Sequence, residues 1–326
     1  MAPKTLVLLS SLACDLGPAL ERKLTTPYRL IRLMDQASAE EVVAALGEAD
    51  AVLTLRYDRA VPAPRLRFLQ VAGAGYDRID FAALPPGVTV ANAFGHEQAI
   101  GEYVLLGMLL WSHDLLEAER SFRAGSWRMS GRMQAPIHQE IAGKTLGIIG
   151  VGRIGRAVAR LARPFGMRVL GCNRTLREEP DIERVFPLGD LHAFLAACDF
   201  VAVCAALAAA TTGLIDAAAL GAMKPSAVLI NVGRGETVDE DALYDALRTR
   251  RIAGAVLDAW YRYPTPDAPD VAPSRHPFHE LPNLIMTPHS SAWTTGMIDR
   301  RVAEMADNFD RFARGAALRN VVHRTG

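Results

Sequence analysis

The sequence predicts an α/β protein made of two units, each built on a parallel sheet. A length of 326 residues is typical of two domains. Short apolar runs with the look of buried strands alternate with helical patterns along the chain. One glycine-rich turn also marks a point where the strand period changes to the helix period. Half of the residues are hydrophobic, so the chain can bury sizeable cores.

That turn lies within residues 141–175, IAGKTLGIIGVGRIGRAVARLARPFGMRVLGCNRT. Gly150, Gly152 and Gly155 form G-x-G-x-x-G between an apolar run and a helix that Gly166 closes. In this motif the first glycine permits the tight turn, the second admits a pyrophosphate, and the third lets helix and strand pack closely. The motif alone could be an ordinary glycine-rich turn, but its complete strand–turn–helix–strand context predicts a dinucleotide site whose helix N-terminus receives the phosphates.

Composition narrows the classes of partner. Lys plus Arg and Asp plus Glu are both 36, so the zero formal charge gives no electrostatic case for nucleic acid. Cysteines 14, 172, 198 and 204 lack metal-like spacing, and we expect reduced core thiols of a cytoplasmic protein and no metal site. Residues 1–14 loosely resemble a lipoprotein signal, but the apolar run is short, so we expect a first strand there and no membrane segment.

The first 95 residues or so predict a small α/β unit. We expect strands at TLVLLS, YRLIRL, AVLTL, RFLQVA and VTVAN, and a helix at 39–46. Residues 72–77 (AGAGYD) follow a strand and can bring backbone N–H groups towards an anion, and residues 92–97 lead into a helix. For both segments an ordinary turn is the alternative.

The remaining elements follow the same α/β style. A long apolar helix at 98–111 continues as a more polar helix to about 124 and suits a hinge or a subunit contact, and 123–140 predicts an irregular arm. Beyond the glycine motif we expect the strands 199–205, 227–232, 253–257 and 283–287, the helices 214–223, 239–248 and 294–314, and a proline-rich loop at 264–282.

Three polar residues fall where successive predicted strands end: Arg234, Asp258 and His289. In a doubly wound sheet these carboxyl ends border the ligand crevice. Singly they could be a surface arginine, a capping aspartate and a loop histidine. Together, beside a dinucleotide motif, they indicate chemistry: histidine exchanges a proton near neutral pH, and arginine grips a carboxylate and polarises the adjacent carbonyl. Hydride transfer between a nicotinamide and an α-hydroxy acid requires such a pair.

On these motifs the chain resembles the D-isomer-specific 2-hydroxyacid dehydrogenases, which include glyoxylate/hydroxypyruvate reductase. The strongest segments are IAGKTLGIIGVGRIGRAVA, MKPSAVLINVGRGETVDEDAL with RIAGAVLDAW, and LPNLIMTPHSSAW, and the resemblance covers essentially the whole chain. It implies two Rossmann-like doubly wound parallel-sheet domains, with a cofactor domain (98–288) inserted into a discontinuous substrate domain (1–97 plus 289–326). It also implies an NAD(P)-dependent oxidoreductase of a small 2-keto or 2-hydroxy acid, and a homodimer built largely on the cofactor domains.

The resemblance also assigns roles to residues of this sequence. Arg234 would bind the substrate carboxylate with help from the Ala74-Gly75 backbone, and His289 would be the acid/base. Asp258 would hold the nicotinamide carboxamide. Other residues would contact the cofactor: Ile100, Gly150, Gly152, Arg153, Ile154, Gly155, Asn173, Arg174, Thr175, Ala205, Thr211, Val232 and Gly233.

Three departures from the family pattern matter. The glutamate that normally pairs with the histidine is Tyr263 here, directly before Pro264. Residues 205–209 read AALAA where Leu-Pro-Leu-Thr-Pro is usual, and the loop 265–277 is longer and richer in proline. A nucleotide-binding sensor that lost turnover, or a dehydrogenase of an unusual small anion, is therefore the alternative function.

The segment 171–175 bears on cofactor choice. NAD enzymes of this fold usually place an acid roughly 20 residues beyond the glycines, where it binds the ribose 2′-hydroxyl. Here the sequence is GCNRT, with no acid. Asn173 does not repel a 2′-phosphate, and Arg174 with Thr175 can bind one, so we expect a preference for NADP(H), with NAD(H) possible. The alternative is an Arg174 that points into solvent and a site that accepts both.

Overall fold

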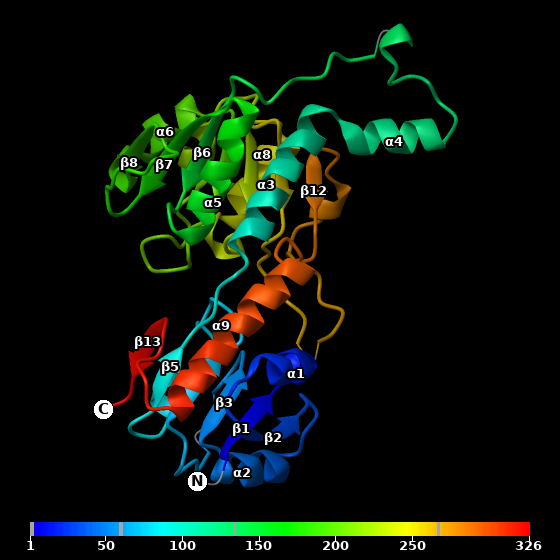
Figure 1. The fold of residues 1–326 in the computed structure, drawn as a ribbon. Helices are drawn as coiled ribbons and strands as arrows, with labels where there is room; N and C mark the ends of the chain where they lie inside the picture. Colours follow the sequence, from blue (N-terminus) through cyan, green and yellow to red (C-terminus); the bar gives the residue numbers. More distant parts are fainter. Residues whose placement is uncertain (1–2, 59–60, 134, 266–267) are drawn as a thin grey trace. The chain divides into compact units, whose positions relative to one another are not determined.

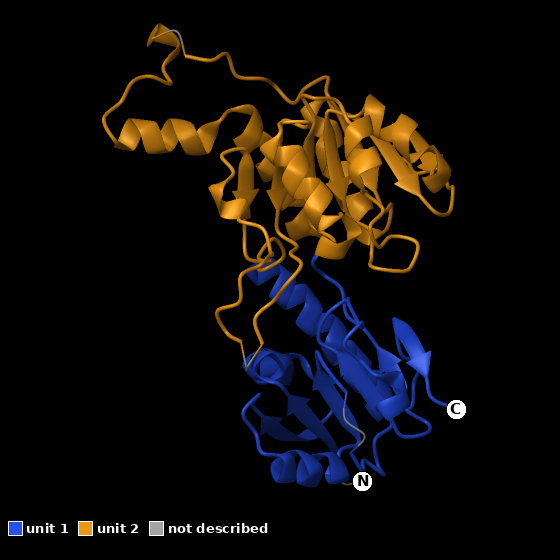
Figure 2. Cartoon of the chain, turned by 180° about the vertical axis from the view of Figure 1, so that it is seen from behind, with its two compact units in different colours: residues 1–96, 294–326 blue, residues 97–293 orange. Residues whose placement is uncertain are grey.

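The computed structural model describes residues 3–58, 61–133, 135–265 and 268–326, and the chain divides into two compact units (Figures 1 and 2). Unit 1 comprises Met1–His96 and Thr294–Gly326, and unit 2 comprises Glu97–Trp293, coloured blue and orange in Figure 2. The chain therefore enters unit 2 once, leaves it once, and returns to complete unit 1. Residues 289–293, including His289, group with unit 2.

Unit 1 is built on a sheet with the order β13-β5-β4-β3-β1-β2. Strands β1 to β5 are parallel, and β13 pairs antiparallel with β5. Taken alone, β1 to β5 have the flavodoxin-like order 2-1-3-4-5. The strands are β1 (Lys4–Leu9), β2 (Tyr28–Leu33), β3 (Ala51–Thr54), β4 (Phe68–Val71), β5 (Thr89–Ala91) and β13 (Val321–Arg324).

Helices cover both faces of this sheet. Helices α1 (Ser11–Lys23) and α9 (Thr295–Ala313) share one hydrophobic core with the sheet, and α2 (Ala39–Glu48) packs into a second core. The central strands are buried on both faces, as covered parallel strands are, which explains their continuous apolar runs. The sequence predicted strands β1 to β5 and helices α2 and α9, but not α1 or β13.

Asp310 ties α9 to the turn between α1 and β2. Its carboxylate accepts hydrogen bonds from the backbone N–H groups of Thr25 (3.0 Å) and Thr26 (2.9 Å) and from both threonine hydroxyls. Burial tends to raise the pKa of Asp310, but the hydrogen bonds from Thr25 and Thr26 outweigh it and lower this pKa below its ordinary value. Residues from the two ends of the chain are thereby joined in one unit.

Unit 2 is built on a wholly parallel sheet with the order β12-β11-β10-β9-β6-β7-β8. Counted from β6, this is the Rossmann order with one added strand, and its switch point lies between β6 and β9. The doubly wound α/β prediction is confirmed. The strands are β6 (Thr145–Ile149), β7 (Arg168–Asn173), β8 (Arg184–Pro187), β9 (Phe200–Val203), β10 (Val228–Asn231), β11 (Gly254–Leu257) and β12 (Leu284–Met286).

Helices again lie on both faces. Helices α3 (Glu97–Ser112) and α5 (Arg153–Ala162) share one core, and α6 (Leu191–Ala197), α7 (Ala217–Ala222) and α8 (Glu240–Arg248) share the other. Short 3₁₀ turns complete the described elements of the chain: Phe81–Ala83, Gly131–Met133, Arg163–Phe165, Leu188–Asp190, Gly235–Thr237 and Phe278–Glu280. Within the described ranges, no helix has the length and apolar character needed to cross a membrane.

The predicted continuation of α3 is interrupted. Asp114 has a left-handed backbone (φ +45°), and α4 (Leu115–Arg123) begins after it as a separate helix. Aspartate tolerates this conformation better than most residues, so the break is local and inexpensive. Figure 1 shows α4 and the irregular arm after it reaching away from the sheet of their own unit.

Candidate active site

The glycine turn after β6 has the geometry that its sequence predicts. Gly150 has φ +91°, and a Cβ there would lie 2.6 Å from the Ala205 backbone. A Cβ on Gly155 would lie 2.4 Å from the Gly150 carbonyl oxygen, so α5 could not pack this closely on the turn. Around Gly152, by contrast, no described atom lies within 4 Å of such a Cβ. The turn therefore has no room for a side chain at Gly150 or Gly155, whereas the space around Gly152 is open.

The start of α5 suits an anion. The helix begins at Arg153. Its N-cap residue is Gly152, which has no side chain that could accept a hydrogen bond from the first-turn N–H groups. The N–H groups of a first helical turn point along the axis and attract negative charge. The open face at Gly152 and this helix terminus therefore fit a dinucleotide pyrophosphate.

Two neighbouring segments pack against the glycine turn. Ala205 is buried next to Gly150, and a Cβ on Gly233 would lie 2.8 Å from the Ala205 carbonyl oxygen. Thr211 closes the loop that follows: its hydroxyl donates to the Ala206 carbonyl (2.8 Å) and accepts from the Ala208 N–H (2.8 Å). The predicted cofactor residues at 150–155, 205–211 and 232–233 thus lie on adjacent strand ends of one sheet.

The end of β7 carries the segment expected to choose the cofactor. Asn173 is partly buried and donates through Nδ2 to the Thr175 carbonyl oxygen (3.0 Å), which orders the turn. Arg174 and Thr175 are exposed. No acidic residue occupies positions 173–175.

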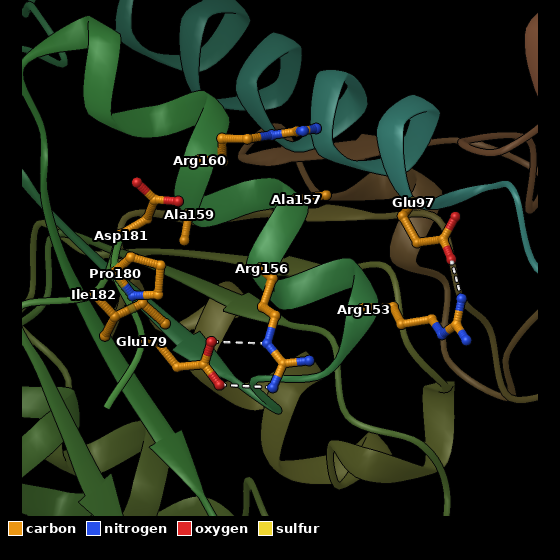
Figure 3. Close-up of a pocket in the computed structure, with 10 residues that line it drawn as sticks. All are labelled: Glu97, Arg153, Arg156, Ala157, Ala159, Arg160, Glu179, Pro180, Asp181 and Ile182. Carbon is orange, nitrogen blue, oxygen red and sulfur yellow. Dashed lines mark hydrogen bonds and ion pairs between the residues drawn. The ribbon is translucent and has the colours of Figure 1, made fainter. Parts of the chain in front are cut away.

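Figure 3 shows a hollow on the flank of α5, between that helix, the start of α3 and residues 179–182. Arg156 forms a two-pronged pair with Glu179 (2.6 and 2.8 Å), and Arg153 lies 3.9 Å from Glu97. The Arg156 guanidinium holds the pKa of the Glu179 carboxyl below its usual range. Its lining includes none of Arg234, Asp258 and His289, which follow other strands of the sheet.

Arg234 follows β10 in a turn that a buried asparagine holds. Asn231 accepts a hydrogen bond from the Gly233 N–H (3.0 Å) and donates one to the Arg234 carbonyl oxygen (2.9 Å). A Cβ on Gly235 would lie 2.4 Å from Trp260, so the turn passes directly over the end of β11. Asn231 is not among the residues predicted from the sequence, although it is a polar residue that ends an otherwise apolar strand.

Tyr263 contacts His289 directly. Its phenol oxygen lies 2.7 Å from the imidazole Nδ1, and the same oxygen accepts the backbone N–H of Trp260 (3.0 Å). Burial raises the pKa of Tyr263 above its ordinary value, although the nearby Arg234 charge opposes the rise. The phenol therefore stays protonated at neutral pH and can either donate to His289 or accept from it.

The proline-rich loop after Tyr263 is fixed at its base. The Arg262 N–H donates to the Pro273 carbonyl (3.0 Å), and the Ser274 hydroxyl donates to Glu240 on α8 (2.6 Å). His276 lies 2.6 Å from Asp241 on the same helix. Pro266 and Asp267, within the predicted loop, lie outside the described residues.

Asp258 lies at the end of β11 and is only 2% exposed. Its carboxylate accepts hydrogen bonds from the Thr287 hydroxyl and from the backbone N–H groups of Ser290 and Ser291. Arg234, Asp258 and His289 thus follow adjacent strands β10, β11 and β12 at one edge of the sheet, as predicted.

The remaining predicted residues lie on other elements. Ile100 is buried on α3 in unit 2. Ala74 and Gly75 belong to unit 1, where they follow the carboxyl end of β4, and Asn92 donates to the Ala74 carbonyl oxygen (2.7 Å).

Comparisons with known proteins agree with this arrangement. The family model described as D-isomer specific 2-hydroxyacid dehydrogenase, NAD binding domain, matches residues 105–291. A glyoxylate reductase of Korarchaeum cryptofilum is 32% identical over 311 residues, covering 93% of this chain and 92% of the relative.

Solved structures agree along the full length. A D-isomer specific 2-hydroxyacid dehydrogenase family protein from Aeromonas salmonicida has a TM-score of 0.82 and 28% identity, covering 99% of both chains. A D-isomer specific 2-hydroxyacid dehydrogenase from Xanthobacter autotrophicus, in complex with NADPH and MES, has a TM-score of 0.79 and 27% identity, covering 99% of this chain and 98% of that one.

Proposed function

Because this chain belongs to the D-isomer specific 2-hydroxyacid dehydrogenase family and is an NAD(P)-dependent oxidoreductase, we propose that it reduces a small 2-keto acid to the D-2-hydroxy acid. The observation that carries the proposal is the edge of the unit 2 sheet. There Arg234 follows β10 and His289 follows β12, with β11 and Asp258 between them, at the same end of the sheet as the open glycine turn. Because the Korarchaeum relative is a glyoxylate reductase, we propose a glyoxylate-sized acid as the substrate class.

Arg234 is proposed to bind the substrate carboxylate. A planar guanidinium forms two parallel hydrogen bonds with a carboxylate, which fixes the orientation of the adjacent C2 carbonyl. The hydrogen bonds of Asn231 with Gly233 and with the Arg234 carbonyl fix the backbone from which this side chain extends. For Ala74 and Gly75 of unit 1, a part in binding the carboxylate stays a prediction.

His289 is proposed to be the acid/base. It would give a proton to the developing alkoxide in reduction and remove it in oxidation. Tyr263, through its 2.7 Å contact with Nδ1, is proposed to orient the imidazole in place of the usual glutamate. Because the phenol is uncharged, it orients the ring without stabilising the imidazolium as a carboxylate would.

The cofactor would be held along the strand ends of unit 2. When bound, the nicotinamide supplies or accepts hydride at C2 of the acid. Gly150, Gly152, Gly155 and the amides at Arg153 and Ile154 would receive the pyrophosphate. Ala205, Thr211, Val232 and Gly233 would also contact the cofactor, with the loop at Ala205 on the adenosine side and Ile100 near the nicotinamide.

NADP(H) is proposed to be preferred over NAD(H). The support is the neutral Asn173, turned towards its own backbone, beside an exposed Arg174 and Thr175. The nearby Glu179 carboxylate is paired with Arg156, which reduces its repulsion towards a 2′-phosphate. The related Xanthobacter structure is a complex with NADPH.

A homodimer built on unit 2 is proposed, with α4 and the arm 124–140 contacting a second copy. Apolar side chains of this segment are strongly exposed, including Trp127 (62%) and Ile137 (97%). Exposed apolar groups gathered on an extended segment are typical of an interface.

Light scattering tests this interface. It should give the dimer mass for the wild type and a lower mass for a Trp127→Ser/Ile137→Asp variant. Leu176→Asp, at another exposed site of unit 2, should keep the wild-type mass. A wild-type monomer would contradict the proposal.

We propose a cytoplasmic location, which the four free thiols support.

The alternative function, a nucleotide-binding sensor that has lost turnover, is not favoured, because the relatives named above are reductases and dehydrogenases. A panel of small 2-keto acids and other small anions, each with NADPH, NADH and the oxidised cofactors, tests the function by nicotinamide absorbance. Turnover of a keto acid supports the proposal; turnover only of another anion, or binding without turnover, contradicts it.

A further inference from the structure

A buried carboxylate lies behind the turn that carries His289. Asp258 Oδ1 accepts from the Thr287 hydroxyl (2.6 Å) and from the Ser290 N–H (2.8 Å), and Oδ2 accepts from the Ser291 N–H (3.0 Å). The three donors flank His289 in sequence on both sides. The carboxylate thus bridges the start and the end of the segment.

His289 itself has a left-handed backbone. Its φ is +56°, in a region that residues other than glycine adopt uncommonly, although histidine does so more often than most. Such a conformation persists only where surrounding contacts hold it, and it is concentrated at functional sites. Within the turn, the His289 N–H donates to the Thr287 carbonyl (3.1 Å). From outside the segment, Asp258 accepts hydrogen bonds from residues on both sides of His289.

A second layer fixes the carboxylate. The Tyr103 hydroxyl on α3 lies 2.5 Å from the Thr287 hydroxyl oxygen. A carboxylate can only accept, so Thr287 gives its single proton to Asp258, and Tyr103 must therefore donate to Thr287. Burial raises the pKa of Tyr103 to about 12, so this donor keeps its proton at neutral pH. Trp260 Nε1 also donates to the Thr287 carbonyl (2.8 Å).

We propose that Asp258 is a positioning residue for His289, which holds the left-handed turn through the Ser290 and Ser291 amides while Tyr103 and Thr287 fix its carboxylate. The proposal rests on the acid/base role proposed for His289. This role is distinct from the predicted contact with the nicotinamide carboxamide, because it uses three hydrogen bonds made within unit 2 and leaves one acceptor site on Oδ2.

The first test is hydrogen exchange at the turn in full-length Asp258→Asn without cofactor. An amide group offers one acceptor oxygen in place of two, so at least one of the two backbone N–H groups loses its partner. Exchange at Ser290 or Ser291 should become about tenfold faster or more, as expected for loss of a charge-assisted hydrogen bond. Asp199→Asn is the matched control, because that carboxylate accepts the Thr145 N–H at a different strand. Unchanged exchange at both amides would overturn the proposal.

If Asp258→Asn does not fold, Tyr103→Phe and Thr287→Val provide the same readout. Each removes one link of the second layer, and each should accelerate exchange at Ser290 or Ser291 by a smaller factor. Unchanged exchange in both variants would overturn the proposal.

The second test separates positioning from cofactor binding. Asp258→Asn should lower kcat for the best keto acid by about tenfold or more, while the Kd for NADPH, read from nicotinamide fluorescence, stays within about threefold. Weaker NADPH binding with unchanged exchange would identify a carboxamide ligand and overturn the proposal, as would faster exchange with unchanged kcat. A fully active His289→Asn would refute the proposed function. The exchange experiment would still show whether Asp258 holds the Ser290 and Ser291 amides.

Discussion

The phenol oxygen of Tyr263 and Nδ1 of His289 are 2.7 Å apart, so a neutral hydroxyl occupies the position from which a carboxylate usually orients this histidine. A carboxylate only accepts and therefore requires a proton on Nδ1. A phenol can also donate, and this one already accepts the Trp260 N–H. Its own proton is free to point at Nδ1, which favours the neutral imidazole that carries its proton on Nε2.

Replacing Tyr263 with Glu should extend reductive activity to higher pH. A carboxylate beside the imidazole stabilises its protonated form, and an opposite charge at this distance typically moves a pKa by about 1–3 units. Reduction requires protonated His289, so the falling limb of kcat/KM should shift upward in Tyr263→Glu. Tyr261→Phe, at a tyrosine that packs on Phe278, is the matched control and should leave the limb in place. Superimposable profiles for wild type and Tyr263→Glu would leave Tyr263 without a part in proton transfer.

Replacing Arg234 with Ala should remove most of the substrate binding. Loss of one partner of a buried, hydrogen-bonded charge pair costs about 2–5 kcal/mol, which is a decrease in kcat/KM of roughly 30-fold to several thousandfold. Arg234→Lys should recover only part of it, because an ammonium cannot form the two-pronged contact. The exposed Arg248, which pairs with Asp245, provides an alanine control. A kcat/KM that is nearly unchanged in Arg234→Ala would contradict the assigned binding mode.

The kcat/KM for NADPH should exceed that for NADH. Arg174→Ala should reduce this ratio by roughly 10- to 100-fold, the value of a charge-assisted hydrogen bond to a phosphate. Asn173→Asp should reduce it further by repelling the 2′-phosphate and binding the ribose hydroxyl. Arg184→Ala, at an arginine that stacks on Phe186, should leave the ratio unchanged. A clear NADH preference in the wild type would refute the prediction.

Asp310→Asn should destabilise unit 1. The carboxylate accepts four hydrogen bonds from two threonines, and losing a charged acceptor of this kind costs about 1–3 kcal/mol. Asp299→Asn, at an exposed position of the same helix, is the control and should have little effect. Urea unfolding at neutral pH measures both.

The difference in unfolding free energy between wild type and Asp310→Asn should depend on pH in a defined direction. The pKa of Asp310 is lowered in the folded state, so its contribution is complete above the unfolded pKa of about 3.9 and is lost as pH falls through the folded pKa. The stability gap between wild type and Asp310→Asn should therefore close in acid. A gap that is independent of pH would contradict the account of this anchor.

The buried parallel strands were predictable because strands covered on both faces read as continuous apolar runs. Helix α1 was not, since Gly17 and Pro18 interrupt its pattern, and β13 is a half-buried edge strand without such a run. The break at Asp114 depends on a backbone angle that periodicity does not encode.

The strand-end residues of the site were predictable from spacing, because parallel strands bring their carboxyl ends to one edge. The supporting contacts were not. Tyr103 and Thr287 are 184 residues apart, and only the folded sheet brings them together beside Asp258. The pairing of Tyr263 with His289 followed from the family pattern, but its donor and acceptor roles required the geometry of Trp260.

Arg234 is proposed to position a keto acid, and His289 to give the proton that accompanies hydride transfer, at the carboxyl ends of the unit 2 strands. The most direct test of this proposal is the transfer of deuterium from reduced cofactor labelled at C4 to the substrate, followed in wild type and His289→Asn. The wild type should form a D-2-hydroxy acid labelled at C2, and His289→Asn should do so about 10²- to 10⁴-fold more slowly. No labelled product from any keto acid, or a rate in His289→Asn equal to that of the wild type, would contradict it.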